Sequence, residues 1–360
     1  MKIVCTVTND LSHDQRMHRI CTTLSAAGHD VTLVGRLLPD STPLPKRSYR
    51  TYRIRCRYHT GKAFYTEYNY RLWRALRRWS FDVICSVDLD TLLAGYLLKT
   101  GKRKLVYDAH EWFSETPEVH HRPLIRRAWR ELGRRLVPYT DARYTVGEKL
   151  GEQLELDYGQ PFSVIRNAPI YGARTNKENS GGVILYQGMV NPGRGLAEAV
   201  TALTHLPHND LLIVGDGPEL QRIIDHADRV GVASRTHFTG LQPPNRLPAY
   251  TDSAWLGLNL LEADSPSYYY SLANKSLDYL QAGLPSIQMD FPEYRRINER
   301  YDCFLLLPRL DARLLADTIE SLRRDPERYT RLRQNCFRAA KDLCWEREAP
   351  RLLAIYEKLA

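Results

Sequence analysis

Short apolar runs alternate with amphipathic helical patterns along most of this 360-residue chain. Such runs are typical of strands buried on both faces of a parallel sheet, with helices as the crossover connections. The predicted strands of a first set are 2–8, 30–34, 51–57, 82–87, 104–109, 142–146 and 162–165, and those of a second set are 183–187, 211–214, 235–238, 255–261 and 285–289. The sequence therefore predicts an α/β fold with two Rossmann-like domains.

The two sets of strands are separated by a segment with three Gly, two Asn and one Pro, which predicts a linker over 169–182. A chain of this length is also longer than one core usually organises. We therefore divide the chain into an N-terminal domain over 1–168, a C-terminal domain over 183–340 and a final helical segment over 341–360. The first strand is not followed by a Gly-x-Gly-x-x-Gly turn, which argues against a dinucleotide cofactor.

Positive charge is concentrated in the N-terminal part of the chain. Residues 1–172 hold 28 of the 51 Lys and Arg but only 18 of the 42 Asp and Glu. The predicted helices 64–79 and 124–137 each have an arginine-rich face opposite an apolar one. These faces have three readings: a solvated surface, a nucleic-acid surface without any recognised module, or a patch that contacts anionic lipid. The asymmetry favours an anionic partner for this half.

Seven cysteines are scattered through the chain without a Cys-x-x-Cys pair. This pattern favours reduced thiols in a cytoplasm and argues against a disulfide framework or a zinc site. The first residues read as a strand and not as a signal peptide, and no apolar run approaches the roughly 20 residues that span a bilayer. Asp88-Leu89-Asp90 resembles an Asp-x-Asp metal motif, but we read Asp90 as the N-cap of a helix. No metal site is predicted.

The segment 273–285 combines a short helix with three chemically active side chains. Asn274, Lys275 and Asp278 share one face of the predicted helix 273–281, since they are three and four residues apart. Lys275 lies in the first turn, where a cation opposes the helix dipole unless an anion is shared with the free backbone N–H groups. Asp278 could accept the hydroxyl protons of a ribose. The helix therefore predicts a nucleoside-diphosphate site.

This segment resembles the donor-binding motif of retaining GT-B glycosyltransferases, the group that includes glycogen and sucrose synthases. Their motif has two carboxylates eight residues apart, followed by Ala-x-Gly-x-Pro. Asp278 stands at the second carboxylate, and Gly283 and Pro285 match the tail. Tyr270, followed by Ser271, stands where the first carboxylate would be. The form Asn-Lys-x-x-Asp-Tyr resembles a bacterial subgroup of this clan.

Two glycine-rich turns of the second domain also match this resemblance. Gly188 to Gly195 joins a strand to a helix, and glycines there would let the backbone approach a phosphate. Arg194 and Gly195 match the family's second cation and its glycine, and Met189 replaces the first cation. The turn containing Gly215 and Gly217 matches the family's Gly-x-Gly-Pro. The resemblance implies that Arg194 and Lys275 hold the diphosphate and that the donor site includes Gly188, Gly193, Gly195, Gly215, Gly217, Tyr270, Ser271, Asn274 and Asp278.

Residues of the first domain complete the predicted site. His110 follows a predicted strand in Tyr-Asp-Ala-His-Glu, which resembles the family segment whose histidine lies beside the donor sugar. Asp10 and Arg16 belong to a first turn that resembles the same bacterial subgroup, which implies acceptor-side roles for both. In this family, an acceptor domain and a donor domain face a central cleft, and the last helix returns to the N-terminal domain.

The resemblance predicts a cytoplasmic, retaining, metal-independent glycosyltransferase without a cofactor. His110, Arg194 and Lys275 would be its catalytic residues. It would move a sugar from a nucleoside-diphosphate donor to a hydroxyl of a bacterial surface glycan, with a lipid-linked acceptor and peripheral membrane contact as partners and no nucleic acid. Two alternatives remain: a nucleotide-sugar 2-epimerase of the same fold, and a silent subunit that binds nucleotide sugar and recruits an active partner. Tyr270 in place of Glu favours the silent subunit.

Overall fold

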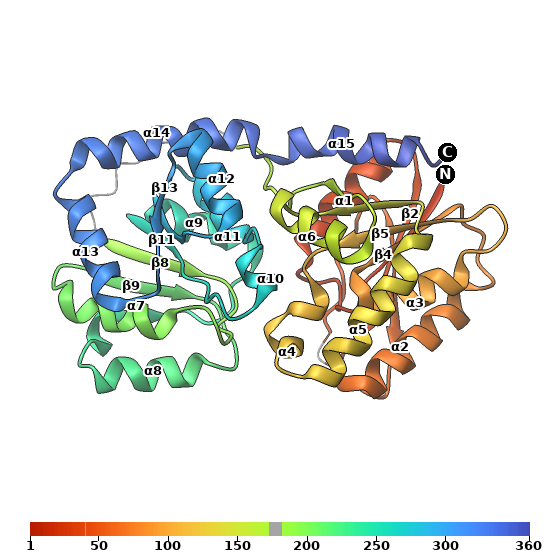
Figure 1. The fold of residues 1–360 in the computed structure, drawn as a ribbon, viewed down its shortest axis with the longest axis horizontal. Coiled ribbons are helices and arrows are strands. Elements are labelled where there is room, and N and C mark those ends of the chain that lie inside the picture. Colours follow the sequence, from red (N-terminus) through yellow and green to blue (C-terminus); the bar gives the residue numbers. More distant parts are fainter. Residues whose placement is uncertain (40, 173–181) are drawn as a thin grey trace. The chain divides into compact units, whose positions relative to one another are not determined.

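The computed structural model describes residues 1–39, 41–172 and 182–360 (Figure 1). The chain divides into two compact units. Unit 1 consists of Met1–Asn167 and Glu346–Ala360, and unit 2 consists of Ala168–Trp345. Most of the predicted linker, residues 173–181, lies outside the described residues.

The described part of unit 1 is built on a seven-stranded sheet in the order β3-β2-β1-β4-β5-β6-β7, with every neighbouring pair parallel. Its strands are β1 (Lys2–Thr6), β2 (Asp30–Leu37), β3 (Arg50–Arg55), β4 (Val83–Val87), β5 (Lys104–Ala109), β6 (Ala142–Thr145) and β7 (Ser163–Val164). Its helices are α1 (Gln15–Ala26), α2 (Gly61–Leu76), α3 (Asp88–Leu98), α4 (Pro117–His120), α5 (Pro123–Leu136), α6 (Glu148–Tyr158) and α15 (Trp345–Glu357).

Helices cover both faces of this sheet, so its central strands are buried throughout. Figure 1 shows α15 on one side of the sheet and α2, α3 and α5 on the other. Leu72 of α2, Leu92 of α3 and Ile84 of β4 are fully buried in the same hydrophobic cluster. On α15, Glu348 forms a buried ion pair with Arg166 at 3.1 Å. The final helix is therefore part of the core of unit 1.

The described part of unit 2 contains a six-stranded parallel sheet in the order β10-β9-β8-β11-β12-β13. Its strands are β8 (Val183–Gln187), β9 (Asp210–Val214), β10 (Thr236–Phe238), β11 (Leu256–Asn259), β12 (Ser286–Met289) and β13 (Phe304–Leu307). Its helices are α7 (Leu196–Ala202), α8 (Leu220–Arg229), α9 (Leu247–Ser253), α10 (Pro266–Tyr269), α11 (Asn274–Gln281), α12 (Pro292–Tyr301), α13 (Ala312–Arg323) and α14 (Pro326–Asp342).

The predicted fold class, α/β with two Rossmann-like parallel-sheet domains, is confirmed. Among the elements that the sequence did not predict are β13, α6 and α9. Leu150, Leu154 and Tyr158 recur every four residues on α6 and are buried, so the helical spacing was present in the sequence. Within the described residues, no helix is both long and apolar enough to cross a membrane.

Candidate functional site

The N-terminus of α11 leaves its first backbone N–H groups without a side-chain cap. Ala273 is the N-cap residue, and its methyl group cannot accept a hydrogen bond. The helix is anchored by its buried face, which includes Leu277 and Leu280. It ends at Gln281, and Gly283, whose φ is 60°, follows the C-cap residue Ala282. Uncapped N–H groups and the positive end of the helix dipole together favour an anion at this position.

Lys275 lies in the first turn of α11 and is only 7% exposed. Its Nζ lies 3.7 Å from the centroid of the Tyr186 ring. Within the described part of the chain, Lys275 forms no ion pair with a carboxylate. Burial lowers the pKa of Lys275 well below its ordinary value, and the neighbouring Arg194 lowers that pKa further. A buried ammonium group without a counter-ion favours the binding of an anion.

Arg194 supplies the second cation of this site. Its guanidinium carbon lies 4.6 Å from the centroid of the Tyr268 ring. Its Nε is buried and has no hydrogen-bond partner among the described residues. A Cβ added to Gly193 would lie 3.0 Å from the Tyr268 ring, so this glycine provides the space in which the ring lies beside the loop. Lys275 and Arg194 therefore both have donor capacity that a diphosphate could use.

The glycines of the two turns also have structural reasons. A Cβ on Gly215 would lie 1.8 Å from the carbonyl oxygen of Gly188, and one on Gly217 would lie 2.4 Å from that of Val190. A Cβ on Gly195 would lie 2.4 Å from the carbonyl oxygen of Leu260. These positions require glycine because backbone packs directly on backbone. The structure accounts for them without a phosphate.

Asp278 lies one turn into α11 and accepts a hydrogen bond from Gln187 Nε2 at 3.0 Å. Gln187 ends β8 and is buried, and its Oε1 has no hydrogen-bond partner within the described ranges. The sequence reading missed Gln187, although its place before Gly188 at the end of a parallel strand was a usable signal. This pair places two polar groups on the same side as Lys275.

The other predicted donor residues differ in exposure. Asn274 is exposed, and Tyr270 is partly buried with its ring 5.0 Å from that of Tyr269. The Ser271 hydroxyl donates to the carbonyl oxygen of Tyr268 at 2.8 Å. Tyr270 and Ser271 follow α10 and lead into α11.

In unit 1, Arg16 and Asp108 form a buried ion pair. Arg16 Nη2 lies 2.7 Å from Asp108 Oδ1, and the two side chains are 3% and 0% exposed. Arg16 also donates to the carbonyl oxygen of Ile165 at 2.7 Å. Burial alone would raise the pKa of Asp108, but Arg16 and His110 outweigh it and lower that pKa. The predicted acceptor-side residue Arg16 therefore has a structural role inside unit 1.

His110 lies after β5 and contacts the same carboxylate. Its Nε2 is 3.0 Å from Asp108 Oδ2, and its backbone N–H donates to Asp88 Oδ1 at 2.8 Å. Burial would lower the pKa of His110, but Asp108 outweighs burial and raises that pKa to about 9. His110 is therefore a partly exposed imidazolium at neutral pH, suited to contact an anion or a hydroxyl group.

Two further carboxylates lie near His110. Asp88 has a left-handed backbone, with a φ of 55°, and Asp90 accepts a hydrogen bond from Thr8 at 2.6 Å. Burial raises the pKa of Asp90 to about 7. The interpretation of Asp90 as an N-cap is wrong, because α3 begins at Asp88 and Val87 is its N-cap. Thr8 and Asp90 are 82 residues apart in the chain, so this contact had no local signal.

Asp10, the other predicted acceptor-side residue, lies in the turn after β1. It accepts hydrogen bonds from the backbone N–H and the hydroxyl of Ser12, both at 3.0 Å, and from the hydroxyl of Ser41 at 3.3 Å. These bonds stabilise the turn. Among the described residues, no cluster of three or more His, Cys, Asp or Glu could hold a metal ion.

Both halves of the chain match models of glycosyltransferase families. Residues 14–168 match the model described as Glycosyltransferase Family 4, and residues 170–339 match that described as Glycosyl transferases group 1. No curated protein matches the sequence.

Several solved structures share the fold over nearly the whole chain. Sucrose-phosphate synthase from Thermosynechococcus elongatus is 18% identical, with a TM-score of 0.82 and coverage of 100% of this chain and 99% of that one. Anabaena Alr3699/HepE in complex with UDP-glucose is 14% identical, with a TM-score of 0.77 and coverage of 99% and 100%. WaaG, a glycosyltransferase involved in lipopolysaccharide biosynthesis, is 15% identical, with a TM-score of 0.71 and coverage of 98% and 99%.

Proposed function

We propose that this GT-B glycosyltransferase transfers a sugar from a nucleoside-diphosphate sugar to an acceptor hydroxyl, with retention of the anomeric configuration. One observation carries the proposal. Lys275 and Arg194 lie beside the uncapped N-terminus of α11, and neither forms an ion pair with a carboxylate among the described residues. Two cations and a helix N-terminus form a site for a group with several negative oxygens.

The same groups would assist the reaction. The bond between the anomeric carbon and the diphosphate oxygen breaks, and the leaving diphosphate gains negative charge. Lys275, Arg194 and the α11 N–H groups would stabilise that charge more strongly than the charge of the ground state. The anomeric carbon then bonds to the acceptor oxygen. The family resemblance suggests that the leaving phosphate takes the acceptor's proton, so no protein nucleophile is required.

Other residues would set the orientation of the donor. Asp278, oriented by Gln187 Nε2 at 3.0 Å, would accept the hydroxyl protons of the ribose. His110, held as an imidazolium by Asp108, remains the proposed contact for the donor sugar. UDP and UDP-glucose in complexes of HepE, together with the role of WaaG in lipopolysaccharide biosynthesis, support a uridine nucleotide donor and a bacterial surface glycan as acceptor.

Incubation of the purified protein with a panel of nucleotide sugars tests this function. Slow release of free sugar and nucleoside diphosphate without an acceptor supports a transferase. An altered sugar on an intact diphosphate would instead support the 2-epimerase, and binding without either product would support the silent subunit. Binding without product would be consistent with the loss of the first carboxylate of the family motif, whose position Tyr270 occupies.

We predict that activity survives removal of divalent cations by EDTA. Lys275, Arg194 and the α11 dipole already supply positive charge to the diphosphate, so a metal ion is not required there. Initial rates with and without EDTA should agree within about twofold, compared with the 10²- to 10³-fold loss typical when a key charge-stabilising group is removed. A complete loss of activity that magnesium restores would contradict the prediction.

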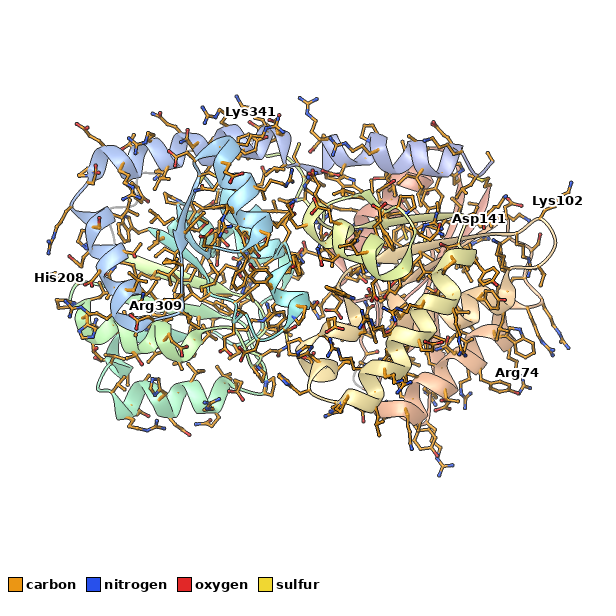
Figure 2. All side chains as sticks on the ribbon, viewed as in Figure 1. Arg74, Lys102, Asp141, His208, Arg309 and Lys341 are labelled. Atoms are coloured by element: carbon orange, nitrogen blue, oxygen red, sulfur yellow. The ribbon has the colours of Figure 1, made fainter. Side chains whose placement is uncertain are left out.

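We also propose that unit 1 contacts anionic lipid through α2. Much of the basic charge of α5 is already paired, since Arg126 contacts Glu115 and both Arg130 and Arg134 contact Asp157. On α2 and the turn after it, Arg71 pairs with Glu67, whereas the exposed Arg74 and Arg78 form no ion pair among the described residues. Figure 2 shows Arg74 on the outer surface of unit 1. The end of α2 is therefore the stronger lipid-binding candidate.

The protein is expected to sediment with vesicles that contain anionic lipid, and added salt should weaken the binding by screening. Glutamine replacements at Arg71, Arg74, Arg77 and Arg78 should reduce sedimentation and leave donor affinity intact. A matched control places glutamine at four exposed arginines of unit 2: Arg300, Arg313, Arg324 and Arg331. Equal losses in both variants would mean a nonspecific charge effect, and no binding of the wild type at low salt would exclude the patch.

A further inference from the structure

Tyr186 is the aromatic residue whose ring forms a cation–π contact with Lys275. It lies in β8 and is 1% exposed, and Lys275 Nζ lies over its ring, 3.7 Å from the ring centroid. Its hydroxyl donates to the carbonyl oxygen of Met189 at 2.7 Å. One side chain therefore contacts both the cation of α11 and the backbone of the turn that carries Gly188.

The Tyr186 ring is the favourable electrostatic contact that the structure shows for the Lys275 ammonium group. Within the described ranges Lys275 has no carboxylate partner, and Arg194 is a like charge that disfavours protonation. An aromatic face attracts a cation but carries no negative charge, so the Tyr186 ring favours the ammonium form of Lys275 without pairing with it as a counter-ion would. A neighbouring carboxylate would instead compete with the diphosphate.

Gly188 provides the space for this arrangement. A Cβ at this position would lie 3.3 Å from Lys275 Cε, which is tighter than an ordinary contact, and 3.4 Å from Nζ. Because the Tyr186 hydroxyl donates to the carbonyl oxygen of Met189, the same side chain contacts both this turn and the amine of Lys275. The Tyr186 ring, the turn at Gly188 and Lys275 are thus in direct contact with one another.

We propose that Tyr186 is a positioning residue that holds the Lys275 ammonium group, charged and without a counter-ion, in place for the donor diphosphate. This inference rests on the proposed function, since it gives the diphosphate its place at Lys275. The role of Tyr186 is separable into two parts: the electrons of the ring face act on Lys275, and the hydroxyl acts on Met189.

The test compares variants that keep the shape of residue 186. Tyr186→Phe keeps the ring face, whereas pentafluorophenylalanine at 186 has nearly the same shape and reverses the attraction of the ring for a cation. With inorganic pyrophosphate as the probe in calorimetry, the fluorinated variant should bind roughly 10-fold more weakly than Tyr186→Phe. The Lys275 ammonium group loses its proton as pH rises, and a ring that repels a cation lowers the pKa of that group. The pH at which binding falls should therefore be lower for the fluorinated variant than for Tyr186→Phe.

A second comparison excludes a purely structural effect. When Lys275 is also replaced by Met, the two variants of residue 186 should bind pyrophosphate equally. The ammonium group that interacts with the ring is then absent, so the ring electrons no longer affect binding. Melting temperatures of the variants check that the shared shape preserves the fold.

The outcomes separate this inference from the proposed function. If wild-type protein binds neither pyrophosphate nor any nucleotide sugar, the proposed function fails. If the wild type binds pyrophosphate but the two ring variants bind it equally and with the same pH dependence, the role of Tyr186 is overturned while the function stands. The role of Tyr186 would also be overturned if the two ring variants differed in pyrophosphate affinity by the same factor in the Lys275→Met background as in the presence of Lys275.

Discussion

Replacing Lys275 by alanine is expected to reduce sugar transfer by on the order of 100- to 1000-fold without reducing the stability of the unliganded protein. The loss of activity follows from the proposed contact with the leaving diphosphate, which strengthens as negative charge develops. A stabilising group of this kind acts mainly in the transition state. The turnover number should therefore fall more than the apparent affinity for the donor.

The stability of the variant follows from the surroundings of Lys275. Lys275 is 7% exposed and has no carboxylate partner within the described part of the chain, so burial of its ammonium group opposes folding, and the contact with the Tyr186 ring offsets only part of this cost. It also lies in the first turn of α11, where a cation is unfavourable, and alanine is a good helix former. We expect an unchanged or higher melting temperature.

The measurement combines initial rates of transfer with thermal unfolding of the same preparation. Lys341→Ala is the matched control, since Lys341 is an exposed lysine of unit 2 near the end of α14, labelled in Figure 2. This control should retain wild-type rates. Near wild-type turnover of Lys275→Ala would remove α11 from the active site, and with it the main support for the proposed function.

The second large effect is expected from Asp108→Asn, which should destabilise unit 1 by about 3–5 kcal/mol. The substitution leaves the guanidinium of Arg16, which is 3% exposed, without its carboxylate. It also removes the partner that keeps His110 protonated, 3.0 Å away. For a unit of this size the melting temperature should fall by roughly 10 °C.

Asp30→Asn is the matched control for this variant, because Asp30 forms an exposed ion pair with Arg50 in the same unit. An exposed pair contributes about 0–1 kcal/mol, so the control should unfold close to the wild type. Removal of both buried charges, by Arg16→Met with Asp108→Leu, should recover part of the lost stability. Equal unfolding of Asp108→Asn and the wild type would show that the buried pair contributes little to the stability of unit 1.

Local patterns in the sequence were sufficient for the fold class and for most of the strands. Apolar runs marked the strands because both faces of a parallel sheet are buried, and this requirement is visible in the composition of each run. The helix α11 could be placed from the spacing of Leu277 and Leu280 and from Gly283 at its end. Lys275 in its first turn was already conspicuous, because a cation there conflicts with the helix dipole.

Some residue types have two common uses that the sequence alone does not separate. Gly215 and Gly217 matched a family turn, but their immediate reason is backbone packing on Gly188 and Val190. The arginines of α5 resembled a free basic face, whereas several of them pair with Glu115 and Asp157. Sequence spacing gives the direction of a side chain but does not show what lies opposite it.

Only the tertiary structure decided which distant residues meet. Arg16 and Asp108 are 92 positions apart, and Gln187 and Asp278 are 91 apart. The ring of Tyr186 reaches Lys275 because β8 and α11 pack in the same unit. Such contacts have no period along the chain, since they arise from the order in which parallel strands assemble and not from neighbours in sequence. The sequence therefore determined most of the helices and strands and placed Lys275 in the candidate site. The tertiary structure determined how deeply Lys275 is buried and which side chains surround its amine.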